Sequence, residues 1–337
     1  MKEFVTVALD AMGGDHAPAE IVKGGVDAVN ASKEVKILMV GDEKQIEAEL
    51  SKYTYDQERI QVVPTTEVIT NNEHPVNAVR NKRDSSLVRC QRMVKSGEAD
   101  AMVSAGSTGA VLAGGQLIVG RLKGIHRPPL APLIPTEKGF SMLIDCGANV
   151  DARPAHLVQF AQIDTVYMKN IMGVENPKVA IVNIGSEEEK GNQLVKETFP
   201  LLKECESINF IGSIEARDIP AGLADVIVCE AFVGNVILKM YEGVAMTLVH
   251  KLKKEMMQSL RSKIGGLLVK PAMKSVMKDF DATEYGGAPL LGLKGLVVKS
   301  HGSSDAYEIM NSILQCITFK KQNINVLIEE ALNQSNQ

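Results

Sequence analysis

The stretch Asp10-Ala-Met-Gly-Gly-Asp-His16 decides how this chain is organised. It follows an apolar run at residues 4–9, typical of a buried parallel strand, and it precedes Pro18, which favours the first turn of a helix. The order strand, tight turn, helix is therefore predicted. Adjacent glycines let a ligand approach the backbone, and the helix N-terminus offers free N–H groups, so an anion site is one interpretation. The alternative is that the two glycines only form a sharp turn that the two aspartates cap.

Outward from this stretch, the chain alternates short β-rich runs with longer helical patterns. Such alternation is the signature of a largely parallel sheet covered by helices on both faces. The candidate strands are residues 4–9, 35–40, 60–63, 101–104, 141–144, 178–184, 207–211 and 225–228. We predict the α/β class and a three-layer α/β/α sandwich. We also predict a single domain over residues 1–337, because no Gly- or Pro-rich linker is long enough to separate two domains.

Five similar segments follow the predicted strands, and open α/β sheets bind ligands beyond the carboxyl ends of their strands. They are residues 10–15, 104–109, 145–149, 183–187 and 230–235. We expect all five to converge on one edge of the sheet. Ser107 and Thr108 place hydroxyls at a predicted helix N-terminus, where they suit phosphate or only cap the helix. Lys190 follows three acidic residues near the same edge, and a fixed cation there suits phosphate or a developing oxyanion.

Composition excludes several classes of protein. With 337 residues, of which 45% are hydrophobic and 23% charged, the chain can bury a large core. A net charge of −4, 4% aromatic residues and no Trp argue against nucleic-acid binding. Five widely spaced cysteines without a Cys-x-x-Cys indicate reduced thiols in a cytoplasmic protein. We expect neither a signal peptide nor a membrane span, since no window holds eighteen uncharged apolar residues.

Missing motifs narrow the chemistry further. None of the 28 glycines stands two positions from another, so the dinucleotide fingerprint G-x-G-x-x-G is not present. The chain also lacks the Walker A pattern, the G-x-S-x-G nucleophile elbow and the H-E-x-x-H zinc helix. Asp10, Asp15 and His16 could ligate a divalent metal, but helix capping explains the same residues. We therefore predict no cofactor and assign no metal site.

Seven motifs resemble the bacterial phosphate acyltransferase family PlsX, from residue 4 to about residue 330. They are residues 8–18, 104–110, 145–151, 183–191 and 232–236, Tyr285-Gly-Gly-Ala-Pro-Leu-Leu-Gly292 and His301-Gly-Ser-Ser-Asp305. The resemblance implies transfer of a long-chain fatty acyl group from acyl carrier protein to inorganic phosphate, which gives acyl phosphate for phospholipid synthesis. It also implies a fold like those of isocitrate and isopropylmalate dehydrogenases and phosphotransacetylase, and a homodimer. Two alternatives are a phosphotransacetylase-like enzyme acting on acyl-CoA and a non-catalytic adaptor between carrier protein and membrane.

The implied chemistry agrees with the missing motifs. Phosphate is mostly a dianion at neutral pH and a thiol is a good leaving group, so neither a general base nor a serine–histidine pair is required. The protein has to position phosphate and stabilise the charge that develops on the thioester oxygen. We assign the catalytic roles to Lys190 and to Asn235, for which a helix N-cap is the alternative. The phosphate pocket is assigned to Asp10, Gly13, Gly14, Asp15, His16, Ser104, Gly106, Ser107, Thr108 and Asn149.

Two basic segments suggest interaction surfaces. The first has one acid among six basic residues, which suits an acidic carrier protein or is only a solvated helix face: Arg80, Lys82, Arg83, Arg89, Arg92 and Lys95. The second, residues 250–278, has eight basic residues and one acid. Its apolar stripe is expected to dock on the inner face of the cell membrane, near a membrane acyltransferase that uses acyl phosphate: Leu260, Ile264, Leu267 and Leu268.

The alternative for this stripe is a dimer-packing helix. Gly265, Gly266 and Pro271 are expected to interrupt the helix. Residues 236–280 should therefore protrude as a hairpin of two helices with an apolar tip.

Overall fold

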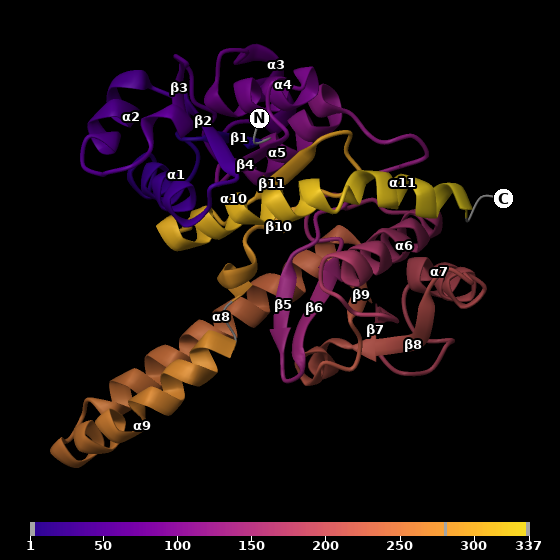
Figure 1. Ribbon diagram of the computed structural model, residues 1–337. Helices are drawn as coiled ribbons and strands as arrows, with labels where there is room; N and C mark the ends of the chain where they lie inside the picture. The colour runs from indigo at the N-terminus through magenta and orange to yellow at the C-terminus, as the bar shows by residue number, and fades with distance from the viewer. Residues whose placement is uncertain (1–3, 280–281, 335–337) are drawn as a thin grey trace.

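The strands form two sheets in the computed structural model, which describes residues 4–279 and 282–334 (Figure 1). The first sheet has six strands in the order β10-β11-β4-β1-β2-β3. They are β1 (Val5–Asp10), β2 (Val35–Gly41), β3 (Ile60–Pro64), β4 (Ala101–Ser104), β10 (Ala288–Pro289) and β11 (Leu296–Lys299). Only β10, at the edge, runs antiparallel to its neighbour. The first half of the chain therefore builds a nearly parallel sheet that the C-terminal segment completes.

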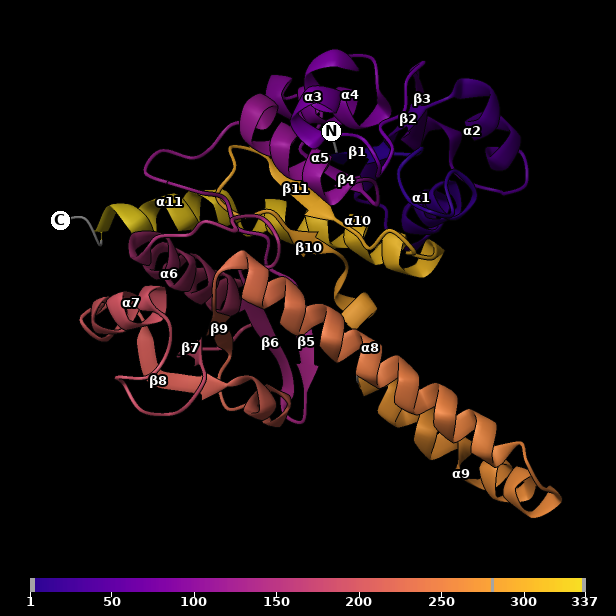
Figure 2. The same cartoon turned by 180° about the vertical axis from the view of Figure 1, so that it is seen from behind.

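The second sheet has five strands in the order β5-β6-β9-β7-β8. They are β5 (Leu133–Thr136), β6 (Gly139–Ile144), β7 (Lys178–Asn183), β8 (Asn209–Glu215) and β9 (Val226–Val228). Here too only the edge strand, β5, is antiparallel to its neighbour. The two sheets lie in separate lobes, and Figure 2 shows the same division from behind.

Helices cover both faces of each sheet because the strands are apolar on both sides. In the first lobe they are α1 (Ala19–Ala31), α2 (Glu43–Leu50), α3 (Pro75–Asn81), α4 (Ser86–Ser96), α5 (Thr108–Gly114) with a π-helical turn (Gly115–Val119), and α10 (Ala306–Lys321). In the second lobe, α6 (Pro154–Asn170), α7 (Gln193–Lys203) and α11 (Ile324–Gln334) pack on one face of the sheet. The 3-10 helix Ala216–Ala221 and the first turns of α8 (Ala231–Met256) pack on the other. One apolar core runs continuously from β1 of the first sheet to β9 of the second, through α6 and α10.

All eight predicted strands are present, but the expectation that they form a single sheet is wrong. Segments 10–15 and 104–109 follow strands of the first sheet, whereas 145–149, 183–187 and 230–235 follow strands of the second. Five segments therefore do not share one sheet edge, because parallel pairing is decided by contacts far apart in sequence. Strands β5, β10 and β11 were not predicted. The single domain over residues 1–337 stays a prediction.

Helices α8 (Ala231–Met256) and α9 (Leu260–Asp279) pack on each other and project from the body as a hairpin (Figures 1 and 2). The expected interruption of the second helix is wrong, since α9 runs through Gly265, Gly266 and Pro271. A Cβ built at Gly266 would lie 3.3 Å from Cβ of Met256, so the glycine lets the two helices approach closely. The chain reverses in the short turn between α8 and α9 instead.

Gly234, in the first turn of α8, packs against the backbone after β6. A Cβ there would lie 2.0 Å from the carbonyl oxygen of Asp145, which is too close for any side chain. We predict that Gly234→Ala lowers the free energy of unfolding by about 2 kcal/mol or more, as overpacking does. Gly243→Ala is the matched control in the same helix, because nothing lies within 4 Å of its added Cβ.

The control should be neutral or raise the free energy of unfolding by up to about 1 kcal/mol through helix propensity. Urea denaturation of both variants measures the difference. Equal stability of the two variants would contradict the close packing of α8 on the Asp145 segment.

Candidate active site

The carboxyl ends of three neighbouring strands meet at the centre of the first sheet. Ser104 of β4 pairs with Lys299 of β11, and Val103 of β4 pairs with Leu9 of β1. The strand order reverses between β1 and β4, because β2 and β3 lie on one side of β1 whereas β4 and β11 lie on the other. Such a switch point leaves a crevice beyond the strand ends, where open α/β sheets bind ligands. The opening motif of the chain lies at this crevice.

Asp10, the last residue of β1, is buried and holds this edge together. Its Oδ2 accepts a 2.6 Å hydrogen bond from the Ser104 hydroxyl, whose oxygen accepts from the Gly106 N–H at 3.1 Å. Burial raises the pKa of the Asp10 carboxyl, and the Ser104 hydroxyl opposes the shift. A Cβ at Gly13 would lie 2.5 Å from Asp10 Oδ2, so a side chain does not fit there. Asp10, Gly13, Ser104 and Gly106 therefore fix one another.

The second glycine of the motif packs against the loop after β11. Gly14 has a φ of +107°, and a Cβ there would lie 2.9 Å from Cβ of Ala105 and 3.1 Å from the Gly302 carbonyl. The same carbonyl accepts a 2.7 Å hydrogen bond from the Asp15 N–H. The glycine turn thus holds the loop that carries residues 300–303.

The possible metal ligands of the motif lie in different environments. Asp10 is buried behind Ser104, whereas Asp15 and His16 are exposed. Within residues 4–279 and 282–334, no group of three or more His, Cys, Asp or Glu side chains is placed to hold a metal ion.

A cavity of about 740 Å³ lies between the two lobes, within the range of about 300–1,000 Å³ common for small-molecule sites. Its polar side chains come from both sheets: Thr108, Asn235, Lys239, Glu242, Lys299, Ser300, His301, Ser303 and Glu308. Its apolar wall is formed by Leu130, Pro132, Leu133, Leu238, Ala245, Met246, Ala288 and Pro289. The cavity therefore offers charged side chains near β11 and on α8, where they are Lys239 and Glu242. Its apolar side is formed by Leu238, Ala245 and Met246 of α8 together with Leu133 of β5.

Asn235 enters the cavity from the first turns of α8. The N-cap alternative is wrong, because Glu230 caps this helix and its carboxylate accepts from the N–H groups of Phe232 and Val233 at 2.7 and 3.0 Å. The Asn235 amide lies next to Gly147, where a built Cβ would be 3.7 Å from Asn235 Oδ1. Gly147 has a φ of +87°, which keeps this side of the amide open. In the part of the chain that the structure describes, no hydrogen bond occupies this amide, so it is available to a ligand in the cavity.

Lys190 is at the same edge of the second sheet as Asn235 but is not among the residues that line the cavity. Its ammonium forms a 2.7 Å ion pair with Glu187, and its side chain is 47% exposed. This pairing raises the pKa of Lys190 and lowers that of Glu187. An exposed pair of this kind contributes little to stability, so Lys190 can exchange its partner at small cost.

Asn149 occupies a structural position. Its side-chain amide donates to Asp145 Oδ2 at 2.7 Å and to the Pro128 carbonyl at 3.0 Å, and it does not line the cavity. Asp145 is fully buried and also accepts from three backbone N–H groups, those of Leu130, Ala148 and Asn149. Burial raises the pKa of Asp145 to about 6 against these hydrogen bonds. The segment after β6 is therefore organised by its own carboxylate.

Of the residues predicted for the phosphate pocket, only Thr108 lines the cavity directly, and of the two predicted catalytic residues only Asn235 does. Ser107 is the N-cap residue of α5 but its side chain makes no capping hydrogen bond, and it is nearly buried. The remainder form the strand ends behind the cavity or the turn beside it. Sequence reasoning missed Lys299, Ser300 and Glu308. The one available signal was Lys299 at the end of an apolar Leu-Val-Val run, just before the quoted motif that begins at His301.

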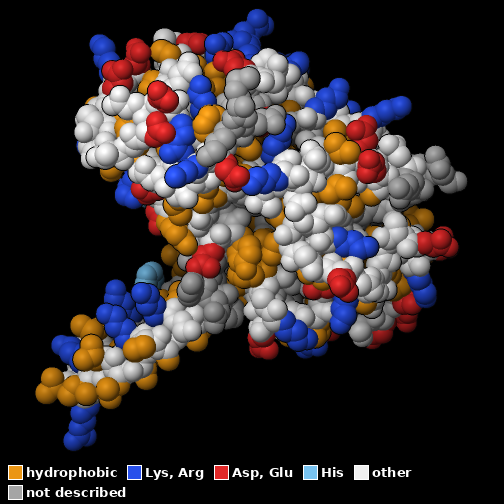
Figure 3. All heavy atoms as spheres, in the orientation of Figure 1, with side chains coloured by type: hydrophobic (Ala, Val, Ile, Leu, Met, Phe, Trp, Pro, Cys, Tyr) orange, Lys and Arg blue, Asp and Glu red, His pale blue; other side chains and the backbone are white. Residues whose placement is uncertain are grey.

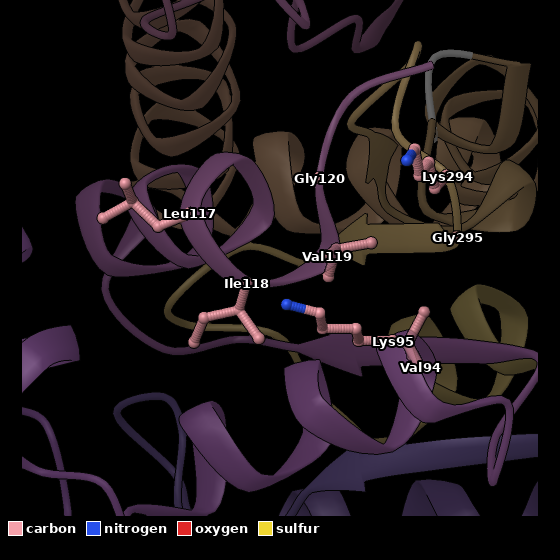
Figure 4. A pocket seen from close by; sticks show the side chains of 8 residues that line it. All are labelled: Val94, Lys95, Leu117, Ile118, Val119, Gly120, Lys294 and Gly295. Carbon is pink, nitrogen blue, oxygen red and sulfur yellow. The ribbon is translucent and has the colours of Figure 1, made fainter. Parts of the chain in front are cut away.

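A second, smaller hollow of about 350 Å³ lies between α4 and the π-helical turn after α5 (Figure 4). Its wall is mostly apolar, and Lys95 and Lys294 contribute ammonium groups. It is separate in its lining residues from the larger cavity, and no strand carboxyl end with a motif residue opens into it.

Solved structures with a similar fold include two phosphotransacetylases. The EutD phosphotransacetylase from Staphylococcus aureus superimposes with a TM-score of 0.60 at 18% identity, covering 95% of this chain and 94% of that one. A phosphotransacetylase from Streptococcus pyogenes gives 0.59 at 17% identity, covering 94% of each chain. At this identity the likeness shows the fold alone. The specific likeness to isocitrate and isopropylmalate dehydrogenases stays a prediction.

Relatives found by sequence share a much higher identity with this chain than these solved structures do. The phosphate acyltransferase of Clostridium novyi (strain NT) is 51% identical over 328 residues, which cover 97% of this chain and 98% of the relative. The family model described as "Fatty acid synthesis protein" matches residues 5–327. The resemblance inferred from the seven motifs is thereby confirmed. The chain is an acyltransferase and belongs to the PlsX family of phosphate acyltransferases.

Proposed function

We propose that this protein transfers a long-chain fatty acyl group from acyl carrier protein to inorganic phosphate and so supplies acyl phosphate for phospholipid synthesis. The observation that carries this proposal is the cavity, which joins a polar end at Asn235 and Lys299 to an apolar wall along α8 and β5. A fatty acyl chain needs the apolar wall, and phosphate needs the polar end. The non-catalytic adaptor is set aside, because the relatives are named as enzymes.

The reaction needs positioning more than acid–base chemistry. An oxygen of the phosphate dianion attacks the thioester carbonyl, the tetrahedral intermediate carries its charge on the carbonyl oxygen, and the carbon–sulfur bond then breaks to release a thiolate. A substantial share of inorganic phosphate is already the dianion at neutral pH, so the nucleophile needs no general base. The Asn235 amide is placed to donate to the oxyanion, and such a donor is worth about 100-fold or more in turnover.

The first functional prediction is direct transfer without an acyl-enzyme. Cys146 lines the cavity, but burial raises the pKa of its thiol well above the usual value, so it is a poor nucleophile. Incubation with acyl-acyl carrier protein alone should leave the mass of the enzyme unchanged. Adding phosphate should then release the carrier thiol and acyl phosphate. A stable acyl adduct on the enzyme would contradict direct transfer. Faster phosphate-dependent turnover of acyl-CoA than of acyl-acyl carrier protein would favour the phosphotransacetylase-like alternative.

Asn235→Ala and Lys190→Ala test the two proposed catalytic residues. Each should lower kcat by about 100-fold, the usual loss for a group that stabilises an oxyanion. Lys190 must leave Glu187 to act, so Glu187→Gln is a matched variant that frees the ammonium without removing it. Turnover of Glu187→Gln should stay at or above the parent level. Near-normal kcat in Lys190→Ala would remove Lys190 from the mechanism and leave Asn235 as the only proposed donor.

The proposed carrier-protein surface comprises two helices rather than one. The basic residues 80–95 divide between α3 and α4, because Ser85 starts a new helix and its hydroxyl accepts from the Val88 N–H. Lys82 is occupied by Glu73 at 2.8 Å, whereas Arg89 and Arg92 are exposed on α4. We propose that this exposed face attracts the acidic donor. A solvated face remains the alternative.

We propose that the exposed ridge of α8 forms a homodimer. Five residues spaced four apart are 46–66% exposed: Val236, Met240, Val244, Leu248 and Leu252. Such a row is a packing ridge for another helix. By length and apolar composition alone α8 could also cross a membrane, which is weak evidence by itself. Its first turns contact the second sheet through Val233 and Ile237, so we propose a dimer contact instead.

We propose that the tip of the hairpin docks on the inner face of the cell membrane, which makes the enzyme a peripheral cytoplasmic protein. Leu260, Ile264, Leu267 and Leu268 are 56–77% exposed. Figure 3 shows hydrophobic side chains at the end of the hairpin with lysines and arginines beside them. Basic residues near an anionic surface contribute about 1 kcal/mol each. A membrane acyltransferase that consumes acyl phosphate is the expected partner there, and a dimer-packing role for the stripe is the alternative.

Anionic liposomes test this docking. Leu260→Glu and Leu268→Glu should each lower the bound fraction about tenfold or more, because burying a leucine contributes about 1.5–3 kcal/mol. Gln258→Glu is the matched control, since it adds the same charge beside the tip without removing apolar surface. Co-sedimentation at two salt concentrations measures the binding. If both leucine variants sediment like the parent while remaining dimeric and active, the tip is not the anchor.

A further inference from the structure

Lys299 is a buried lysine at the polar end of the cavity. It is the last residue of β11 and is only 7% exposed, yet it is among the residues that line the cavity. Its strand partner is Ser104, whose hydroxyl is bonded to Asp10. A lysine placed at a strand end in the centre of a sheet has little freedom to move, so its ammonium is held at one place in the cavity wall.

Among the described residues, the polar contacts of the ammonium are with two backbone carbonyls. Its Nζ donates to the backbone carbonyls of Ala105, at 3.4 Å, and of Ser300. Within residues 4–279 and 282–334, no carboxylate forms an ion pair with it. Asp10 of β1, Asp15 of the glycine turn and Glu308 of α10 face it from farther away. The third N–H is therefore available to a ligand.

A buried cation without an ion pair is costly, because neither water nor a counterion balances its charge. Burial accordingly lowers the pKa of Lys299 to about 8, against the three carboxylates. A structural lysine would gain a partner carboxylate, whereas this one is balanced best by an anion that enters the cavity. Phosphate is the anion that the reaction brings there.

We infer that Lys299 binds the substrate phosphate through its Nζ and so determines the affinity for the acyl acceptor. This inference rests on the proposed function, because it assigns an acceptor role within the same cavity. Asn235 faces the same space from α8, so phosphate held at Lys299 lies on the first-sheet side and the thioester carbonyl on the second. The two lobes thereby have different roles: the first binds phosphate and the second stabilises the oxyanion.

Two sources of phosphate chemistry could occupy Lys299: inorganic phosphate, and the phosphodiester of the donor's pantetheine arm. Calorimetric titration of the enzyme with inorganic phosphate at pH 7, without any donor, distinguishes them. Lys299→Met should bind phosphate at least tenfold more weakly than the parent, as loss of a hydrogen bond to a charged group predicts. Lys294→Met, in the separate smaller hollow, is the matched control and should bind like the parent.

Steady-state kinetics give the second arm. Lys299→Met should raise KM for phosphate at least tenfold with little change in KM for the acyl donor. A rise in KM for the acyl donor with little change in KM for phosphate would assign Lys299 to the donor's phosphodiester and overturn the inference. Equal phosphate affinity in Lys299→Met and the parent would also overturn it, because a merely structural lysine changes both KM values or neither.

A third arm needs only the parent protein and therefore does not depend on a variant that folds. Phosphate affinity should fall as pH rises from 8 to 10, a range in which phosphate stays a dianion while the Lys299 ammonium, with a pKa of about 8, loses its proton. Lys299→Arg keeps its charge and should lose this dependence. A flat profile for the parent would contradict the inference. If phosphate binds through Lys299 but no acyl phosphate forms from acyl-acyl carrier protein, the proposed function is wrong while the assignment of Lys299 to phosphate binding is retained.

Discussion

The buried hydrogen bond between Asp10 and Ser104 is the constraint on which the site depends. It joins the ends of β1 and β4 at the point where strand order reverses, and it requires glycine at position 13 because a Cβ would collide with the carboxylate. Lys299 then follows from strand pairing, since β11 is parallel to β4 and aligns the lysine with Ser104. These three strand ends are thereby fixed together at the crevice that such a sheet leaves at its switch point, where we infer that phosphate binds.

Local pattern predicted the elements, but not how they pair. Alternation of apolar runs and helical stretches located eight strands within a few residues, because burial on both faces makes a parallel strand apolar throughout. The division into two sheets was missed, since pairing between strands such as β6 and β9 joins residues more than eighty positions apart. Strand β11 was also missed; it enters the first sheet from the far end of the chain, beside β4, so its pairing too joins residues far apart in sequence.

The site shows the same limit in its chemistry. Motif positions found Thr108 and Asn235, because glycine and small polar residues after a strand are visible in sequence. Sequence does not show whether a lysine is exposed or buried, so it favoured Lys190, which is half exposed and paired with Glu187. Lys299 is buried and forms no ion pair with any carboxylate of the described residues. What separates them is desolvation. Only the fold shows which cation lies beside the cavity and is shielded from water.

Helix α8 links the chemistry to the hairpin, because one side of it lines the cavity while another carries the exposed ridge. On the proposed function, the product keeps its fatty chain and gains a charged head. Moving that chain into water costs about 0.8 kcal/mol for each methylene, so release into solvent becomes less favourable as the chain lengthens. A path along the apolar side of α8 toward lipid avoids most of this cost. The helix that positions Asn235 therefore also points along the direction in which a fatty product leaves most easily.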